Sequence, residues 1–494
     1  MSSRNVFMNR LAKTLLVLAV FAGATTIAFA QATGDQGAPP AATGPDTTTQ
    51  VIENPPLSGL DEPSFEPGYG ARSYLLPSVQ VSEAVDTNAT GSVGSNTTIR
   101  DVTRVLGSLT LQEMWKTHPL DLVYSGGASR YYGPGAKTFQ IHSLAATQRF
   151  LWRTGQLALR DSFSYLPQGS FGFSSFGGAG AFNGGGGLGG LGGGVTSGGG
   201  IAGGGGGGVF GSGQFGSVGN QPRITNSSIA DITQSLSPRA SLVLSGGFGL
   251  TEFINAPTGY INSQQTTGQA GYNYQLSRHD QIALTYAYQE FHFPRAGSGS
   301  FNVNVWQVMY GHRISGKWDL KLGGGPQWIH TNGLVQILPN IFVQSNRSVI
   351  SGSGRASLMY HMSTRSNLTM TYSHYTNPGS GFFAGANTDA VRFALSHTLT
   401  RRWSSTLDTG YSRNSRILAG PASIANNAST YQYWYAGAGL RRQLGRHFGA
   451  FTSYQYDSIR FNSGFCTTGS NCNTYGRHVG LIGLDWTPHP IRLD

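Results

Sequence analysis

A four-residue turn pattern recurs through the second half of the chain and constrains the fold more than any other feature. Each copy is an apolar residue, then Ser, Thr or Gly, then one free position, and then Arg, Lys or His. Each copy lies between two segments in which apolar and polar residues alternate. This period of two is that of β-strands with one apolar and one polar face, so the pattern predicts a series of hairpins. The copies are LSPR (236–239), LSRH (276–279), ISGK (314–317), MSTR (362–365), LTRR (399–402) and LGRH (444–447).

Two earlier turns, WKTH (115–118) and WRTG (152–155), lie between similar segments. The eight turns join sixteen strands, and one further strand at each end, near 76–86 and 475–487, raises the count to eighteen. Sixteen is the alternative, because the first of these strands, SVQVSEAV, is weak. The connections on the opposite side are longer, variable, and rich in Gly, Ser and Asn. We predict an all-β chain that closes into a single antiparallel barrel, with short turns at one end and long loops at the other.

Composition indicates what surrounds such a barrel. Only 11% of the residues are charged, against about 25% in soluble domains, and the mean hydropathy is −0.19. After the N-terminal segment, no apolar run is long enough for a membrane-spanning helix, which needs about 20 residues. A chain that avoids charge without being continuously apolar is typical of a transmembrane β-barrel. In such a barrel every second strand residue meets lipid, and closure pairs every backbone group.

The hairpin at residues 269–291 illustrates how the two faces of the barrel wall differ. In a membrane barrel the apolar positions face lipid and the polar positions face a wet interior, the reverse of a soluble β-sheet. The residues expected to face lipid are Tyr272, Tyr274, Ile282 and Leu284, and those expected to face the interior are Gln269, Asn273, Gln275 and Thr285.

The start of the chain predicts export. Residues 1–30 contain Arg4, Arg10 and Lys13, then a short apolar run, and then Ala-Phe-Ala at 28–30, which together predict a signal peptide cut before Gln31. A membrane anchor is the alternative, but the apolar run is short and is interrupted by Gly and Thr. Residues 31–70 hold six acidic residues and no Lys or Arg, are rich in Pro and Thr, and are predicted to be a disordered segment. The barrel is then expected over residues 71–488.

The tryptophans are spaced as membrane-interface residues would be. Two aromatic girdles, one strand length apart, are expected where a barrel wall leaves the bilayer. Core tryptophans of a secreted β-protein are the alternative, which offers no reason for this spacing. Trp115, Trp152, Trp318, Trp403 and Trp486 lie near the short turns, Trp328 and Trp434 lie ten residues from a turn residue, and Trp306 fits the second girdle less well.

On its signal peptide, turn repeat and aromatic girdles, the chain resembles the outer-membrane β-barrel porins of Gram-negative bacteria over about residues 71–488. The resemblance implies an outer-membrane location, with the short turns in the periplasm and the long loops outside. It implies contact with outer-membrane lipid, lipopolysaccharide and the barrel-assembly machinery, and it implies no cofactor and no nucleic acid; a homo-oligomer is left open. Such barrels often end on an aromatic residue that the assembly machinery reads. Here Trp486 is followed by TPHPIRLD, so residues 489–494 are predicted to be a tail.

Basic residues at the polar strand positions are the candidate functional residues. An interior with excess Arg would favour anions through its field and through bidentate contacts with carboxylate or phosphate. Acidic counterparts are expected to be few, with Asp121 and Asp408 as the candidates. The alternative is that these arginines are solvated or pair with loop carboxylates. The pore-lining candidates are Arg160, Arg355 and Arg392 at mid-strand, whose side chains would converge in one zone, and Arg149, Arg313, Lys321 and Arg441 nearer the short turns.

Two long connections have unusual composition. Residues 168–222 form a Gly-rich insertion with no charged residue from 162 to 222. Glycine has a large ordering entropy, which favours a flexible surface loop; a loop folded into the lumen and an adhesive loop remain open. The only cysteines, Cys466 and Cys472, lie in one loop and are predicted to form a disulfide in an oxidising compartment.

Motifs for catalysis or metal binding are not convincing. GHRISGK (311–317) matches part of a phosphate-binding loop, but Trp318 replaces the Ser or Thr that would hold Mg²⁺, and the segment lies on a strand and turn. The histidines do not cluster with metal spacing, so we predict no metal and no enzyme. Three functions are left: a channel for passive diffusion of small hydrophilic solutes, which the pattern favours, an exopolysaccharide or lipid exporter, and a closed structural or adhesive barrel.

Overall fold

The computed structural model describes residues 73–88, 99–115, 117–133, 136–166, 222–254, 261–294, 299–338, 341–363, 365–379, 383–418, 429–462 and 474–493. The predicted signal peptide, acidic segment, Gly-rich insertion and cysteine pair therefore lie outside the described residues. In those that are described, no helix is long and apolar enough to cross a membrane.

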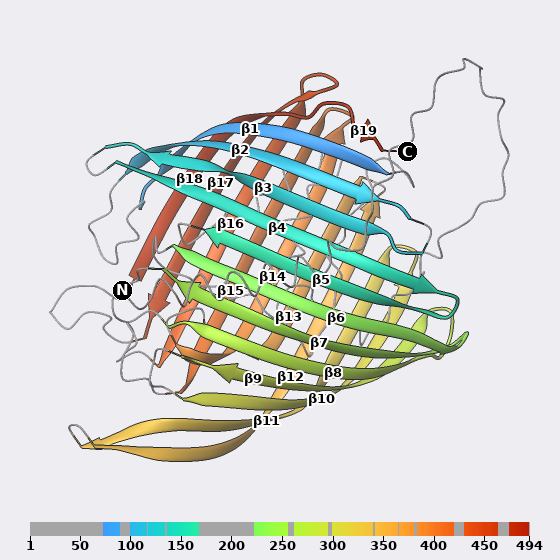
Figure 1. The fold of residues 1–494 in the computed structure, drawn as a ribbon, viewed down its shortest axis with the longest axis vertical. Coiled ribbons are helices and arrows are strands. Elements are labelled where there is room, and N and C mark those ends of the chain that lie inside the picture. Colours follow the sequence, from blue (N-terminus) through green and yellow to red (C-terminus); the bar gives the residue numbers. More distant parts are fainter. Residues whose placement is uncertain are drawn as a thin grey trace, which may run out of the picture. The chain divides into compact units, whose positions relative to one another are not determined.

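The described residues form one antiparallel sheet that closes on itself (Figure 1). Each strand pairs with the strands before and after it in the sequence, which is the simplest barrel topology. The strands are β1 Tyr74–Asp86, β2 Arg100–Glu113, β3 Leu120–Tyr131, β4 Lys137–Trp152, β5 Gly155–Leu166, β6 Arg223–Ser237, β7 Ala240–Phe253, β8 Ser263–Gln275, β9 Asp280–His292, β10 Ser300–Ser315, β11 Trp318–Leu338, β12 Ile341–Ser363, β13 Ser366–Asn377, β14 Ala384–Thr400, β15 Trp403–Leu418, β16 Thr430–Gln443, β17 Phe448–Phe461, β18 Thr474–Trp486 and β19 Ile491–Arg492.

The barrel closes between β1 and β18. Eight register pairs join them, from Val79 opposite Trp486 to Asp86 opposite Val479. The predicted ring of eighteen strands is therefore confirmed, and the alternative of sixteen is wrong. The nineteenth strand is a short addition: after Trp486 the chain returns to the same edge, where β19 pairs with the first two residues of β1. The tail thus contributes two residues to the sheet.

The eight predicted turns join the strand pairs expected of them, from β2–β3 to β16–β17. One connection at the opposite end differs from expectation. Strands β11 and β12 contain 21 and 23 residues and continue to pair as far as Leu338 and Ile341. Their hairpin extends past the neighbouring strands (Figure 1), so a hairpin replaces the long loop predicted there.

The hairpin of β8 and β9 has the predicted inside-out polarity. Tyr272 and Leu284 expose 44% and 49% of their surface, whereas Asn273 and Thr285 on the opposite face expose 6% and 4%. Such a row of exposed apolar side chains is unfavourable in water at about 25 cal/mol per Å². The outer face of these strands is therefore suited to lipid.

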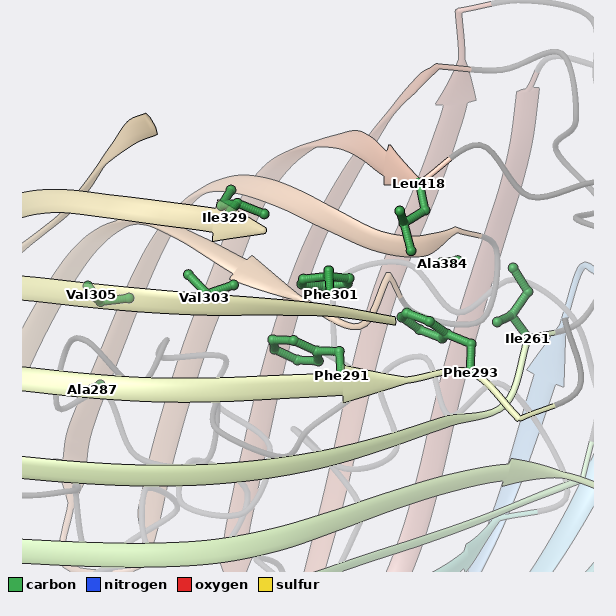
Figure 2. Packing of buried hydrophobic residues seen from close by; sticks show 10 residues of the cluster. All are labelled: Ile261, Ala287, Phe291, Phe293, Phe301, Val303, Val305, Ile329, Ala384 and Leu418. Carbon is green, nitrogen blue, oxygen red and sulfur yellow. The ribbon is translucent and has the colours of Figure 1, made fainter. Parts of the chain in front are cut away.

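This polarity reverses toward the long-loop end of the barrel, in a region that we call the collar. In β10 the inward Phe301, Val303 and Val305 are buried, while Asn302 and Asn304 lie on the outer face. Figure 2 shows the cluster that they form with residues of neighbouring strands and connections. An apolar inner face and a polar outer face suit a wall with water outside, so the collar extends beyond the lipid. The collar's inner residues are Ile261, Phe291, Phe293, Phe301, Val303, Val305, Ile329, Ala384 and Leu418, together with Tyr375, Phe383, Ala386, Tyr431, Tyr433, Ile459 and Phe461.

Candidate functional site: the inner wall of the barrel

Ion pairs between neighbouring strands are the main feature of the inner wall. Arg160 of β5 forms a salt bridge with Asp231 of β6, and both side chains are buried. The partner of Arg160 is a residue of a neighbouring strand, and not a loop carboxylate as in the alternative given above. Strand register decides this pairing, because Ala158, two residues before Arg160, lies directly opposite Asp231.

A second pair links β14 to β15 near the middle of the barrel. Arg392 donates from Nε and Nη2 to the two carboxylate oxygens of Asp408, at 3.1 and 2.5 Å. The hydroxyl of Tyr435 on β16 donates to the same carboxylate at 2.8 Å. The bidentate geometry fixes the orientation of the guanidinium and stabilises the carboxylate. Arg392 is therefore held against the wall.

A third pair spans an intervening strand. The Nη2 of Arg441 on β16 lies 2.6 Å from Oδ2 of Asp485 on β18, so the contact crosses β17. Gly449 of β17 lies directly opposite Asp485. A Cβ at residue 449 would lie 2.6 Å from Oδ1 of Asp485, so the absence of a side chain there makes room for the carboxylate.

A fourth pair lies at the seam where the barrel closes. Arg477 of β18 donates from Nε and Nη2 to Asp86 of β1 at 2.9 and 2.5 Å, and each side chain is only 1% exposed. Arg104 of β2 is also buried and donates to the hydroxyl of Ser129 at 3.3 Å. Arg477 and Arg104 were not among the pore-lining residues predicted from the sequence. The available signal was parity: Arg104 shares the face of Ser108 and Gln112 on β2, and Arg477 shares the face of Asp485 on β18.

Asp457 of β17 connects the second and fourth pairs. Its Oδ1 accepts hydrogen bonds from Tyr433 at 2.8 Å and from Gln455 at 2.7 Å, and it lies directly opposite Arg477 in the register. An isolated buried carboxylate would be costly, so these donors are what keep it in the wall. Charged side chains thus extend from β14 through the seam to β2. We call this set the charged wall: Arg392, Asp408, Asp457, Arg477, Asp86 and Arg104.

The inner face of β8–β10 is different, because its polar residues are amides and hydroxyls. Gln265, Gln269 and Asn273 of β8 are buried on the inner face, followed by Gln289 of β9 and Gln307 of β10. Gln307 donates to the hydroxyl of Ser353 at 2.9 Å. We call these five residues the amide wall. Over most of their length the inner face of these strands is therefore polar without being charged.

The structure places the seven basic candidates on the inner face of their strands but does not bring them together. Arg355 of β12 and Arg392 of β14 are separated by one strand, whereas Arg160 on β5 lies nine strands from β14 in a ring of eighteen. Three mid-strand arginines therefore do not converge in one zone. Arg355 donates to the sulfur of Met309 at 3.2 Å, Arg313 pairs with Asp319 at 2.9 Å, Arg149 is half-buried and Lys321 is exposed near the short turns.

The expectation of few inward carboxylates is wrong. Asp121 and Asp408 do face inward, but five more aspartates share that face, and most of them pair with a basic residue. Pairing explains the excess, since a buried guanidinium in a polypeptide wall is best stabilised by a carboxylate on a nearby strand. The five are Asp86, Asp231, Asp319, Asp457 and Asp485.

The tryptophans lie on the outer face of the barrel or at its short turns, on the parity opposite to the inner wall. Trp115, Trp152, Trp306, Trp434 and Trp486 are exposed. The indole of Trp318 stacks on Tyr360 with ring centroids 3.9 Å apart, the guanidinium of Arg442 lies 5.2 Å from the ring of Trp403, and Trp328 is half-buried. Their role at a membrane interface stays a prediction.

No group of three or more His, Cys, Asp or Glu suited to a metal ion occurs among the described residues.

No protein-family model matches the chain, and no curated relative matches it. Solved structures match it over most of their length. They include OccK2 (OpdF) of Pseudomonas aeruginosa, with a TM-score of 0.40, 10% identity, and coverage of 84% of this chain and 98% of that one. OpdK of the same organism, in a structure with vanillate, has a TM-score of 0.39 and 9% identity, and the match covers 84% of this chain and 99% of that one. The ferric-catecholate import receptor Fiu of E. coli K12 has a TM-score of 0.40 and 9% identity, and the match covers 83% of this chain and 81% of that one. The chain is similar to these outer-membrane proteins in its barrel, and the similarity does not extend to a solute.

Proposed function

We propose that the chain is an outer-membrane channel for passive diffusion of small hydrophilic solutes. The observation that carries this proposal is the polarity of the closed ring between the collar and the short turns: an apolar outer face suited to lipid and an inner face of charged, amide and hydroxyl groups. A wall of this kind separates lipid from a hydrophilic path. A closed structural barrel would not need such a polar lining in the part of the wall between the collar and the short turns.

We propose further that the channel prefers anions. On the inner face of the described strands, basic residues outnumber carboxylates even after the ion pairs are counted. The surplus is the part that a passing ion would experience, because a lumen charge acts over a screening length of about 8 Å in physiological salt. The inward basic residues include Arg100, Arg104, Arg149, Arg160, Arg223, Arg313, Lys321, Arg355, Arg392, Arg416, Arg441 and Arg477, against Asp86, Asp121, Asp231, Asp319, Asp408, Asp457 and Asp485.

Single-channel recording in planar bilayers tests both parts. We expect stepwise conductance, and a reversal potential in a salt gradient that indicates anion preference. Arg355→Glu should shift that potential toward cations, since it reverses a mid-strand charge without breaking any of the interstrand ion pairs described above. The control is Arg401→Glu with Arg402→Glu, two exposed residues in a short turn, which should change it little.

Absence of stepwise conductance from a correctly folded barrel would overturn the channel proposal and favour a closed barrel. A wild-type channel that prefers cations, or a turn variant that shifts the potential as much as Arg355→Glu does, would overturn only the anion preference.

A further inference from the structure

The outer face of strands β14–β17 carries three successive rows of residues with different chemistry. Register pairs place Val391, Tyr411, Trp434 and Ser458 in one row across these strands. The next row toward the long loops, two residues along each strand, is Asp389, Arg413, Gln432 and Arg460. The row beyond it is Asn387, Ser415, Thr430 and Asn462. The order from the membrane outward is therefore aromatic, then charged, then neutral hydroxyl and amide.

The two arginines of the middle row are the central feature. Arg413 and Arg460 are both exposed, and they lie two strands apart with Gln432 directly between them. At about 4.8 Å per strand, their backbones are about 10 Å apart. They contrast with the arginines of the inner ion pairs, because neither Arg413 nor Arg460 forms an ion pair with any residue that the structure describes.

The carboxylate of this row is engaged elsewhere. Asp389 lies directly opposite Arg413, but its Oδ1 lies 2.6 Å from Nδ1 of His374 and accepts a hydrogen bond from Tyr372 at 3.2 Å. Its contacts therefore run toward β13, away from the arginines. The two guanidinium groups are left to face outward at the level where the aromatic row ends.

The corresponding row on strands β8–β12 carries no arginine. There the register row is Thr266, Glu290, Asn302, His330 and Ser348, across β8–β12. It lies beyond Tyr288 and Trp328, just as the arginine row lies beyond Tyr411 and Trp434. Among the described strands, the exposed outer-face arginines at this end are Arg130 of β3 and the pair Arg413 and Arg460, and only that pair shares a register row. A general need for solvation does not require two guanidinium groups in one row, so the pair indicates a specific anionic neighbour.

We propose that this sector binds a phosphorylated glycolipid of the outer leaflet, that is, lipopolysaccharide. Its acyl chains would lie against the aromatic row, its phosphates against Arg413 and Arg460, and its sugar hydroxyls against the outermost row. Guanidinium groups bind phosphate through paired N–H donors. The inference rests on the proposed outer-membrane location, with the long loops outside, and adds a lipid site that the channel proposal does not require.

The test compares lipid binding by two matched double variants in detergent. Arg413→Gln with Arg460→Gln removes both charges of the sector, and Arg401→Gln with Arg402→Gln removes two exposed charges at the opposite end of the barrel. Native mass spectrometry after titration with lipopolysaccharide should give binding at least tenfold weaker for the first variant, at about 1 kcal/mol per charge at an anionic surface. The second variant should bind as the wild type does.

Further titrations define the ligand. Lipopolysaccharide treated with phosphatase should bind the wild type as weakly as intact lipopolysaccharide binds the Arg413→Gln, Arg460→Gln variant. Equal binding of phosphatidylglycerol would overturn the glycolipid in favour of any anionic lipid, and displacement by millimolar inorganic phosphate would overturn it in favour of a free anion. An equal loss of lipopolysaccharide binding in the Arg401→Gln, Arg402→Gln variant would overturn the proposed site.

Conductance separates this proposal from the previous one. Both double variants should conduct as the wild type does, because the arginines of the sector lie on the outer face. Lost lipid binding with normal conductance supports the lipid site alone. Normal lipid binding by a barrel that never conducts overturns the channel and leaves the lipid site standing.

Discussion

The two ends of strand β10 follow opposite rules. Toward the short turns, Trp306, Val308 and Tyr310 are exposed on the outer face while Gln307 is buried inside. Toward the long loops, Phe301 and its inward neighbours are buried while the outer face carries asparagine. The period of two is unbroken, and only the polarity of the two faces exchanges. The exchange marks where the solvent outside the wall changes from lipid to water, so the membrane boundary can be placed between Asn304 and Trp306.

The largest expected effect comes from the collar. Phe301→Ala should lower the free energy of unfolding by about 3–5 kcal/mol, because Phe301 is fully buried and stacks on Phe291 with centroids 4.5 Å apart. Tyr272→Ala is the control on the exposed outer face of β8, opposite Leu284 in the register, where lipid can fill the space. Denaturant unfolding in lipid vesicles measures both. Equal losses at the two positions would contradict a packed collar.

The next effect comes from the membrane region. Leu284→Arg places a charge on the exposed outer face of β9 and should cost about 2–4 kcal/mol near the bilayer midplane. Asn302→Arg, on the outer face of the collar, should cost close to nothing because water solvates the charge there. Unfolding in the same vesicles compares them, and a similar cost at both positions would place the boundary elsewhere.

Orientation distinguishes the two ends in the cell. With Cys466 and Cys472 both changed to Ser, an impermeant thiol reagent should label Asn387→Cys in intact cells but not Ser277→Cys. Asn387 lies on the outer face at the long-loop end, and Ser277 lies in a short turn that is expected in the periplasm. Labelling of Ser277→Cys alone would show that the barrel has the opposite orientation in the membrane.

The smallest expected effect tests where the membrane boundary lies on the outer face of β10. Asn302→Leu changes an outer collar position to an apolar residue and should alter stability by no more than about 0.5 kcal/mol, as for most surface substitutions. Stabilisation by more than 1 kcal/mol in vesicles would indicate that lipid reaches this level, and the boundary would then lie nearer the long loops. Asn304→Leu, one register pair closer to Trp306, is the control.

Most of the architecture was predictable because it is local. A turn tetrad and a period of two depend on neighbouring residues alone, and they predicted eight turns, eighteen strands and the inside-out hairpin of β8 and β9. The collar was not predicted, since Phe301 and Asn302 alternate with the same period on either side of the boundary. The hairpin of β11 and β12 was missed because these strands have 21 and 23 residues, about twice the length expected of a membrane-spanning strand.

The inner wall was less predictable because its contacts depend on register. Parity correctly placed Arg160, Arg392 and Arg441 inside. It could not show that Asp231 lies opposite Ala158, two residues from Arg160, or that Arg441 reaches across β17 to Asp485. Those relations follow from how adjacent strands are offset, and offset depends on the whole ring rather than on any one segment.

The seam has a consequence for the order in which the barrel is built. Arg477 and Asp86, which meet there, are 391 positions apart in the sequence. The edge of β1 cannot find its partner until the last strand has been made and exported. Until then the growing sheet has two open edges, and unpaired edges invite pairing with other chains. Formation of the buried contact between Arg477 and Asp86 therefore belongs to the final step of assembly, and a chain truncated before β18 would remain an open sheet.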